Sequence, residues 1–323
     1  IDIRKKLYIL SLTIIVIGII SLFVRGMNFG IDFTGGRTYV VRFDKDVKTN
    51  DVRSLLEKSF GETPEVKTFG PSNQVKVTTK YMIDNSDKAT DSIVENKLYE
   101  GLKSVYTTPI TKDDFLSDKA GKLLGKLSSN KVGPTIADDI KLSSMYAIII
   151  ALFVIFVYIA IRFKKWQYGL GGVISLTHDA LIVISMYSLF WGLLPFGMEV
   201  DQAFIAAILT IIGYSINDSV IIFDRIREYI GLYPKRDLKE NMNAAMNSTL
   251  GRTINTSGTT IITLLAMFIL GGEMIRGFIF ALLVGIVVGT YSSIFNATPV
   301  AYDFIMIQKR RKEKKALKLQ EKK

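Results

Sequence analysis

Residues 203–228 read AFIAAILTIIGYSINDSVIIFDRIRE, an apolar stretch that carries Asn217 and Asp218 in its second half. Its apolar part has about the 20 residues that an α-helix needs to cross the hydrocarbon of a bilayer. A carboxylate inside such a helix costs roughly 2.5 to 3.5 kcal/mol on insertion scales, so it normally faces a protein interior or a water path and carries function. Asp218 is therefore the first candidate for a functional residue.

Five other long apolar runs indicate a polytopic α-helical membrane protein. Hydrophobic residues make up 49% of the 323-residue chain. The first run follows basic residues, as a signal peptide does, but it has no small-residue cleavage site and is long for a signal peptide, so we interpret it as an uncleaved span. Six transmembrane helices are thus predicted, at residues 7–24, 145–161, 169–194, 203–223, 254–271 and 277–306.

The distribution of Lys and Arg predicts the orientation of these spans. The loops and ends on one side are rich in basic residues, whereas the short flanks on the other side hold only Arg25 and Arg276. By the positive-inside rule both termini are cytoplasmic and the region between spans one and two is extracytoplasmic. The basic run at residues 309–323 supplies most of the net charge of +11. We interpret it as a cytoplasmic tail in contact with solvent, anionic lipid or a cytoplasmic protein, and expect no nucleic-acid partner.

The region between the first two spans has the composition of a soluble α+β domain. Strands are predicted at residues 37–43, 65–69 and 74–79, with a short last strand at 131–132, and helices at 50–60 and 88–105. This βαββαβ order is the ferredoxin-like pattern. The predicted organisation is a first transmembrane helix at 1–25, an extracytoplasmic domain with linkers at 26–144, a five-helix transmembrane domain at 145–308 and the tail at 309–323.

The residue inventory argues against an enzyme and against a metal site. The chain has no Cys and a single His, so it can form neither a disulfide nor a usual Cys or His metal site. The extracytoplasmic region holds no clustered nucleophile, base and acid. We therefore expect no cofactor and no catalytic site.

Five stretches, which follow one another from the first span to the last, resemble the motifs of the SecF family of bacterial protein-export membrane subunits. This family belongs to the resistance-nodulation-division superfamily. The stretches are NFGIDFTGG at 28–36, VGP at 132–134, SLTHD at 175–179, GYSINDSVIIFDRIRE at 213–228 and RTINTSGTT at 252–260.

The resemblance implies an accessory subunit of the Sec translocase in the bacterial cytoplasmic (inner) membrane. Such a subunit works with SecD beside the SecYEG channel and uses the proton gradient to move unfolded preproteins. SecD is a separate chain in many bacteria and a fused N-terminal half in others. Because the chain opens with Ile1 rather than Met, we expect either a trimmed SecF or the second half of a fused SecDF.

The resemblance also places Asp218 and Arg252 at positions associated with proton conduction. Physically, a buried carboxylate resists ionisation until a cation approaches it, so we expect Asp218 to alternate between a protonated state and a state paired with Arg252. Asn217, Thr256 and Asp179 complete the predicted proton-coupling set. Asp218 and Asn217 as glue between helices, Arg252 as an anchor at the membrane edge, and His178-Asp179 as polar packing against the fourth span remain open. Residues 224–227 are interpreted as a cytoplasmic ion-pair cluster.

Glycines mark both connections between the soluble domain and the spans. Two adjacent glycines allow a tight turn with unusual backbone angles, and the nearby Asp32 could cap that turn. A phosphate-binding loop is not expected there, because the Lys and following helix of such a loop are missing. The predicted hinge or domain seat comprises Gly30, Asp32, Gly35 and Gly36 on the outgoing chain, and Gly133 and Pro134 on the returning chain.

Three functions stay open at this stage. The first is a proton-driven subunit of protein export, whose extracytoplasmic domain contacts an unfolded polypeptide through exposed sheet edges or apolar patches. The second is half of a proton-driven exporter of small molecules or lipids, although about 120 external residues leave little room for a drug-sized pocket. The third, a membrane scaffold without coupling, leaves Asp218 unexplained.

Overall fold

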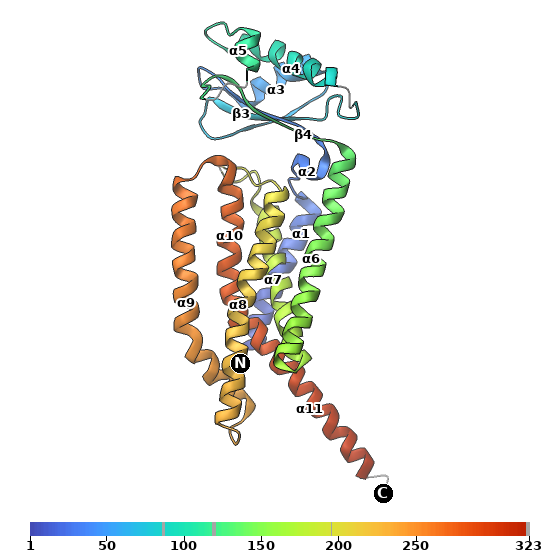
Figure 1. The fold of residues 1–323 in the computed structure, drawn as a ribbon, viewed down its shortest axis with the longest axis vertical. Coiled ribbons are helices and arrows are strands. Elements are labelled where there is room, and N and C mark those ends of the chain that lie inside the picture. The colour runs from blue at the N-terminus through green and yellow to red at the C-terminus, as the bar shows by residue number, and fades with distance from the viewer. Residues whose placement is uncertain (86–87, 118–120, 195, 321–323) are drawn as a thin grey trace.

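The computed structural model places a bundle of long helices beneath a small α+β domain (Figure 1). It describes residues 1–85, 88–117, 121–194 and 196–320. Within these ranges six helical segments are long and apolar enough to cross a membrane, as predicted. They are α1 (Arg4–Arg25), α6 (Pro134–Phe163), α7 (Trp166–Phe190), α8 (Gln202–Leu232), α9 (Leu238–Leu270), and a continuous segment made of α10 (Glu273–Ser292), the π-helix η2 (Ser293–Ala297) and α11 (Thr298–Gln320).

Two of these helices begin well before the predicted spans. Helix α6 starts at Pro134 instead of residue 145, and α9 starts at Leu238 instead of residue 254. Hydropathy detects only the apolar part of a helix. The first turns of α6 and α9 are polar, so they lie outside the apolar runs from which the spans were predicted. Pro134 stands at the first helical position, where proline is favoured because its missing N–H has no helical acceptor to lose.

The α+β domain has the predicted order of its main elements. They are β1 (Gly36–Arg42), α3 (Thr49–Phe60), β2 (Glu65–Thr68), β3 (Gln74–Thr79), α4 (Lys88–Leu102) and β4 (Gly125–Val132). The four strands form one antiparallel sheet in the order β2-β3-β1-β4. The short helices α2 (Ile31–Thr34), η1 (Lys103–Val105) and α5 (Lys112–Leu116) complete the described elements of the domain.

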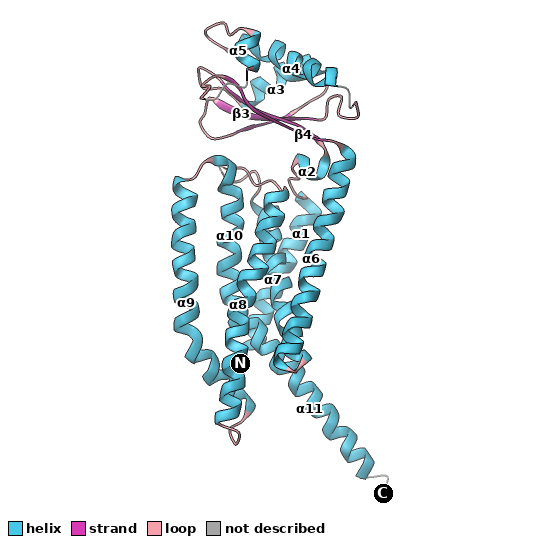
Figure 2. Cartoon of the chain, in the orientation of Figure 1, coloured by secondary structure: helices cyan, strands magenta, loops and turns pink. Residues whose placement is uncertain are grey.

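The two faces of the sheet differ. Helices α3, α4 and α5 cover the face that points away from the bundle, and the other face points toward the bundle (Figure 2). Alternation along the strands directs Tyr39, Val41, Val75 and Val77 into the helix-covered core. The residues between them on β1 and β3 therefore face the membrane bundle.

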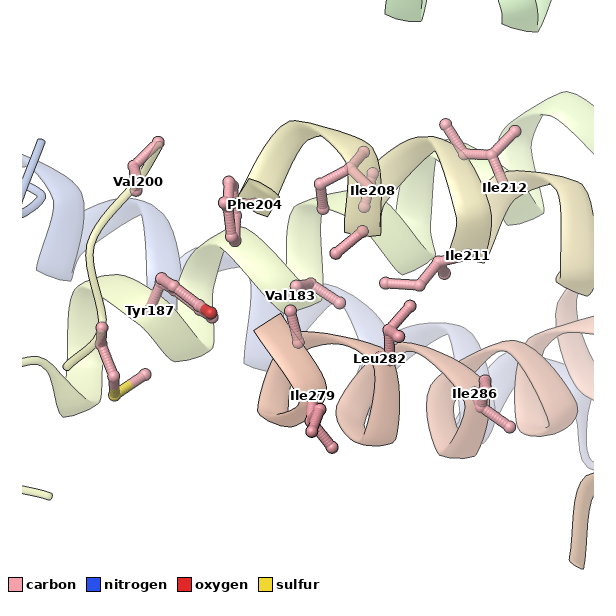
Figure 3. Close-up of a cluster of buried hydrophobic side chains, with 14 of the residues drawn as sticks. Val183, Tyr187, Val200, Phe204, Ile208, Ile211, Ile212, Ile279, Leu282 and Ile286 are labelled. Carbon is pink, nitrogen blue, oxygen red and sulfur yellow. The ribbon is translucent and has the colours of Figure 1, made fainter. Parts of the chain in front are cut away.

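Helices α7, α8 and α10 form the centre of the bundle. Apolar side chains of these three helices interlock in one cluster, which includes Val183, Tyr187, Phe204, Ile211 and Leu282 (Figure 3). In the most apolar 18 residues of each helix, 50% of α7 and 44% of α8 is buried, against 17% of α1 and α9 and 6% of α6. The outer faces of α1, α6 and α9 are thus left for lipid or for another protein.

Candidate functional site

Helix α8 carries buried polar side chains at positions where hydrocarbon would be expected. Ser215, Asp218 and Ser219 are almost fully buried. Residues three and four apart lie on adjoining parts of a helix surface, so these side chains form a polar strip. Two buried carboxylates are found at this strip. Asp218 belongs to α8 itself, and Asp179 belongs to the neighbouring helix α7.

The first carboxylate is Asp218, which is 2% exposed. Ser257 of α9 lies within hydrogen-bonding reach of it, and Ser257 in turn accepts a hydrogen bond of 2.7 Å from the hydroxyl of Thr290 on α10. Arg252 acts on Asp218 electrostatically. Among the described residues the two form no direct ion pair, and Oδ2 of Asp218 has no hydrogen-bond partner. The site is therefore a buried carboxyl group with a nearby but separate cation.

Two predicted members of this set lie apart from the carboxylate. Asn217 is on an exposed part of α8, and Thr256 is exposed on α9. The hydroxyl of Thr256 donates to the backbone carbonyl of Arg252 at 2.9 Å. Three other threonines of α9 make similar bonds to backbone carbonyls three or four residues earlier, namely Thr259, Thr260 and Thr263.

The second carboxylate is Asp179 of α7, which is fully buried. It accepts a hydrogen bond of 2.8 Å from Ser215 of α8 and lies 3.0 Å from Nδ1 of His178. Ser292 of α10 also bonds to it. Asp179 thus makes polar packing contacts with the fourth span, as one of the two sequence interpretations expected, and its contacts do not include Asp218.

A pocket of about 690 Å³ lies between the C-terminal ends of α6 and α8 and the first half of α9. Arg252 is one of its lining residues. Its other charged groups confirm the predicted ion-pair cluster, since Asp224 pairs with Arg227 at 3.0 Å and with Arg162 at 3.3 Å. Arg225 pairs with Glu228 at 2.7 Å.

The predicted hinge residues meet one another where the α+β domain joins the spans. Gly35 and Gly36 have φ angles of +67° and +144°, which side chains rarely adopt. A Cβ atom on Gly35 would lie 3.4 Å from the Cα atom of Pro134. The outgoing and returning connections therefore pack against each other.

Asp32 bonds to a different partner from the one predicted. It does not cap the glycine turn; instead its Oδ2 atom accepts a hydrogen bond of 2.9 Å from the backbone N–H of Gln202, at the start of α8. The predicted turn contains one turn of helix, α2, which follows Gly30. The N–H of Gly30 donates to the carbonyl of Val200 at 2.9 Å, so the segment also joins the α7–α8 loop.

An ion pair holds the sheet against the same loop, and a hydrogen bond holds it against the connection between α1 and α2. Lys76 of β3 pairs with Glu199 at 2.5 Å, and the side chains are 22% and 15% exposed. Lys67 of β2 donates to Asn28 at 3.0 Å. Burial raises the pKa of Asp201, the N-cap of α8, and the neighbouring carboxylates Asp32 and Glu199 raise it further, whereas Lys76 opposes the shift. This seat is thus a charged contact between the domain and the membrane bundle.

The sequence interpretation missed Ser257 and Thr290 at Asp218, and Lys76 and Glu199 at the seat. Ser257 lies inside the RTINTSGTT stretch but five residues from Arg252, so the helical spacing of three or four residues does not place it beside Arg252. The pairing of Lys76 with Glu199 links residues 123 positions apart and left no signal in the sequence. Across the described residues, no group of three or more His, Asp or Glu side chains could hold a metal ion.

Comparison with known families gives two matches along the chain. The family described as "Protein export membrane protein SecD/SecF, C-terminal" matches residues 114–307, and the "SecD/SecF GG Motif" matches residues 20–47. The second match contains the Gly35-Gly36 seat, and the first contains both buried carboxylates.

Relatives and solved structures agree with these matches. The chain is 42% identical to the protein translocase subunit SecF of Rhodothermus marinus, over 93% of this chain and 91% of that protein. It is 34% identical to the subunit of the same name from Haemophilus influenzae, over 93% and 84%. The crystal structure of SecDF, a translocon-associated membrane protein from Thermus thermophilus, superposes with a TM-score of 0.76 at 30% identity, and the match covers 94% of this chain and 38% of the SecDF chain.

Proposed function

Because the chain belongs to the SecF family of protein translocase subunits, we propose that it couples proton entry at Asp218 to preprotein export. The observation that carries the proposal is the carboxyl group of Asp218, buried between three helices beside a cation with which it is not paired. Such a group can accept a proton or pair with Arg252, and each state requires a different arrangement of α8 and α9.

The surroundings of Asp218 suit a proton path. Thr290 and Ser257 form a line of hydroxyl groups toward the carboxylate, and Arg252, which acts on Asp218 electrostatically, lines an open pocket. One charge that moves through the membrane field releases about 2.3 kcal/mol per 100 mV. Several protons per cycle would supply the roughly 5.5 kcal/mol that inverts a two-state equilibrium from 1:99 to 99:1.

The proposed topology puts the termini and the arginine pocket in the cytoplasm and the α+β domain outside the cytoplasmic membrane. This orientation rests on the positive-inside rule. The proposed domains are residues 1–25, 26–144, 145–308 and 309–323. We assign the α+β domain to the ferredoxin-like class, an assignment that the strand order β2-β3-β1-β4 supports.

The proposed partners are SecD, SecYEG and the unfolded preprotein. The exposed outer faces of α8 and α9 offer a surface for SecD, where Gly213 and Gly258 have open space beside them. Small residues of this kind allow close approach of transmembrane helices. The edge strands β2 and β4 offer backbone groups to an extended polypeptide.

Proton flux into vesicles tests the coupling. The vesicles contain this chain with SecD and SecYEG, and an unfolded polypeptide is held in transit. Asp218→Asn and Arg252→Met should abolish both flux and forward movement of the polypeptide, whereas Asp224→Asn, which removes a half-buried, ion-paired carboxylate of the same helix, should leave flux unchanged. Asp179→Asn should preserve flux if this residue serves only in packing.

Flux and movement that survive Asp218→Asn would make Asp218 a structural contact and the subunit a scaffold. Flux that stops while polypeptide movement continues would separate proton conduction from export. Both results would overturn the proposal.

A further inference from the structure

The arginine pocket, defined as the space lined by Arg162, Asp224, Arg225, Arg227, Glu228 and Arg252, lies where α8 leaves its apolar section. The apolar run of α8 ends at Phe223, and the charged residues follow at once. The pocket also receives the C-terminal end of α6 and the Ser248–Arg252 part of α9. It is therefore located at the depth of the lipid headgroups on this side of the bundle.

Positive charge is in excess in the arginine pocket. Four guanidinium groups face two carboxylates, which leaves two positive charges without a counter-charge. Asp224 is shared by Arg162 and Arg227, and Glu228 holds Arg225. In the described part of the chain Arg252 makes no ion pair, so the pocket has room and charge for one more anion.

Two of the four guanidinium groups lie over aromatic rings. Arg225 lies 5.0 Å from the ring centre of Tyr229, and Arg227 lies 5.7 Å from that of Phe163. The Nε atom of Arg225 also donates to the hydroxyl of Ser248 at 3.1 Å. Planar guanidinium groups in fixed positions match the oxygens of a phosphate better than a flexible ammonium does.

We propose that the arginine pocket binds the phosphodiester of an anionic phospholipid headgroup. The apolar surface beside the pocket favours a lipid over a free phosphate as the source of this group. Ile161 of α6, which flanks Arg162, is 72% exposed, so an acyl chain can lie against it while the phosphate enters the pocket. Basic pockets between transmembrane helices on the cytoplasmic side are sites for such headgroups.

A bound phosphate would also act on Arg252. This residue lines the pocket and acts electrostatically on Asp218, so a phosphate attracts the guanidinium away from the carboxylate. This consequence rests on the proposed function, whereas binding itself does not. Binding is therefore measured without a proton gradient.

The test compares lipid binding by the intact chain and by two double variants with equal charge loss. Arg225→Gln with Arg227→Gln changes the pocket. Lys235→Gln with Arg236→Gln changes an exposed basic pair in the α8–α9 turn, where Arg236 stacks on Tyr233 at 4.2 Å much as Arg225 stacks on Tyr229. Each protein is placed in phosphatidylcholine nanodiscs with increasing phosphatidylglycerol, and retained lipid is counted by native mass spectrometry.

We expect the pocket variant to bind phosphatidylglycerol about tenfold or more weakly and the turn variant to bind as the intact chain does. Equal binding by all three proteins, or an equal loss in both variants, would overturn the proposal. A second measurement adds inorganic phosphate or glycerol phosphate to the intact chain in phosphatidylcholine alone and records thermal stability. If either compound stabilises the chain as much as phosphatidylglycerol does, the site binds free phosphate and the assignment to a lipid is overturned.

A pocket variant that does not fold is replaced by Arg225→Lys, which keeps the charge and the partner Glu228. Loss of the bidentate fork should still weaken phosphatidylglycerol binding in this variant. Unchanged binding in folded Arg225→Lys would overturn the proposal.

Discussion

Replacement of Glu199 by Gln should release the α+β domain from its seat on the membrane bundle. The carboxylate of Glu199 is 2.5 Å from Nζ of Lys76, and both side chains are mostly buried. A hydrogen bond to a charged group contributes about 1.5 to 3 kcal/mol. Since Lys76 keeps some contact with water, we take the lower value, which corresponds to about a tenfold change in the ratio of docked to undocked domain.

Spin-label distances can measure that ratio, because the chain contains no Cys. Labels at Lys58→Cys on α3 and Leu270→Cys at the end of α9 report the separation of the domain and the bundle; both positions are exposed. The unmodified seat should give one narrow distance distribution. Glu199→Gln should raise the ratio of undocked to docked domain about tenfold, and the undocked domain should appear as a second, broader population of distances.

The matched control is Glu100→Gln, which breaks the exposed pair of Glu100 and Lys103 on the far side of the domain. Exposed pairs contribute only about 0 to 1 kcal/mol, and this pair does not touch the seat. Identical distributions in the intact chain and in Glu199→Gln would refute the reasoning. So would a second population of equal size in the control.

Two further predictions concern stability. Lys131 and then Arg37 lower the pKa of Asp91 below its ordinary value of 3.8, so the stability this carboxylate contributes is present above that value and is lost as pH falls through the lower folded-state pKa. The hydrogen-exchange protection of β1 and β4, measured relative to the intrinsic exchange rate at each pH, should therefore fall in acid, and an unchanged acid dependence of this protection in Asp91→Asn would contradict this. A Cβ atom on Gly171 would lie 2.5 Å from the carbonyl oxygen of Ala297, whereas one on Gly213 would meet nothing. Gly171→Ala should thus cost about 1 to 3 kcal/mol of unfolding free energy and Gly213→Ala nothing, and equal melting temperatures in detergent would argue against the packing described.

Sequence patterns were sufficient for the elements with regular hydrophobicity. Residues 74–79 were predicted as a strand and form β3 with the same ends. The last strand was predicted at residues 131–132, whereas β4 runs from Gly125 to Val132. Its middle residues Ser128, Ser129 and Asn130 are exposed on a sheet edge, so they carry no apolar alternation that sequence could reveal.

The residues of the candidate site also differ in how far the sequence predicts them. Asp218 could be predicted because a carboxylate in an apolar helix is rare, and Arg252 followed from the family motif. Asn217 adjoins Asp218 in the sequence, and Thr256 belongs to a run of polar residues that follows Arg252, but helix geometry turns both to exposed positions. Ser257 and Thr290 come together only when α9 and α10 pack, and no pattern within either helix specifies that packing.

Helix α8 connects the seat of the α+β domain, the contact with Asp179 and the carboxylate of Asp218 within one continuous helix. Its first N–H is held by Asp32 of the seat, Ser215 is held by Asp179, and Asp218 is one turn further along. A rotation that carries Asp218 toward Arg252 also turns Ser215 relative to Asp179 and pulls on Gln202 through about 16 residues of uninterrupted hydrogen-bonded backbone, which spans roughly 24 Å at 1.5 Å per residue. Under the proposed proton coupling, a change of protonation at Asp218 would therefore be transmitted along α8 to the seat of the α+β domain.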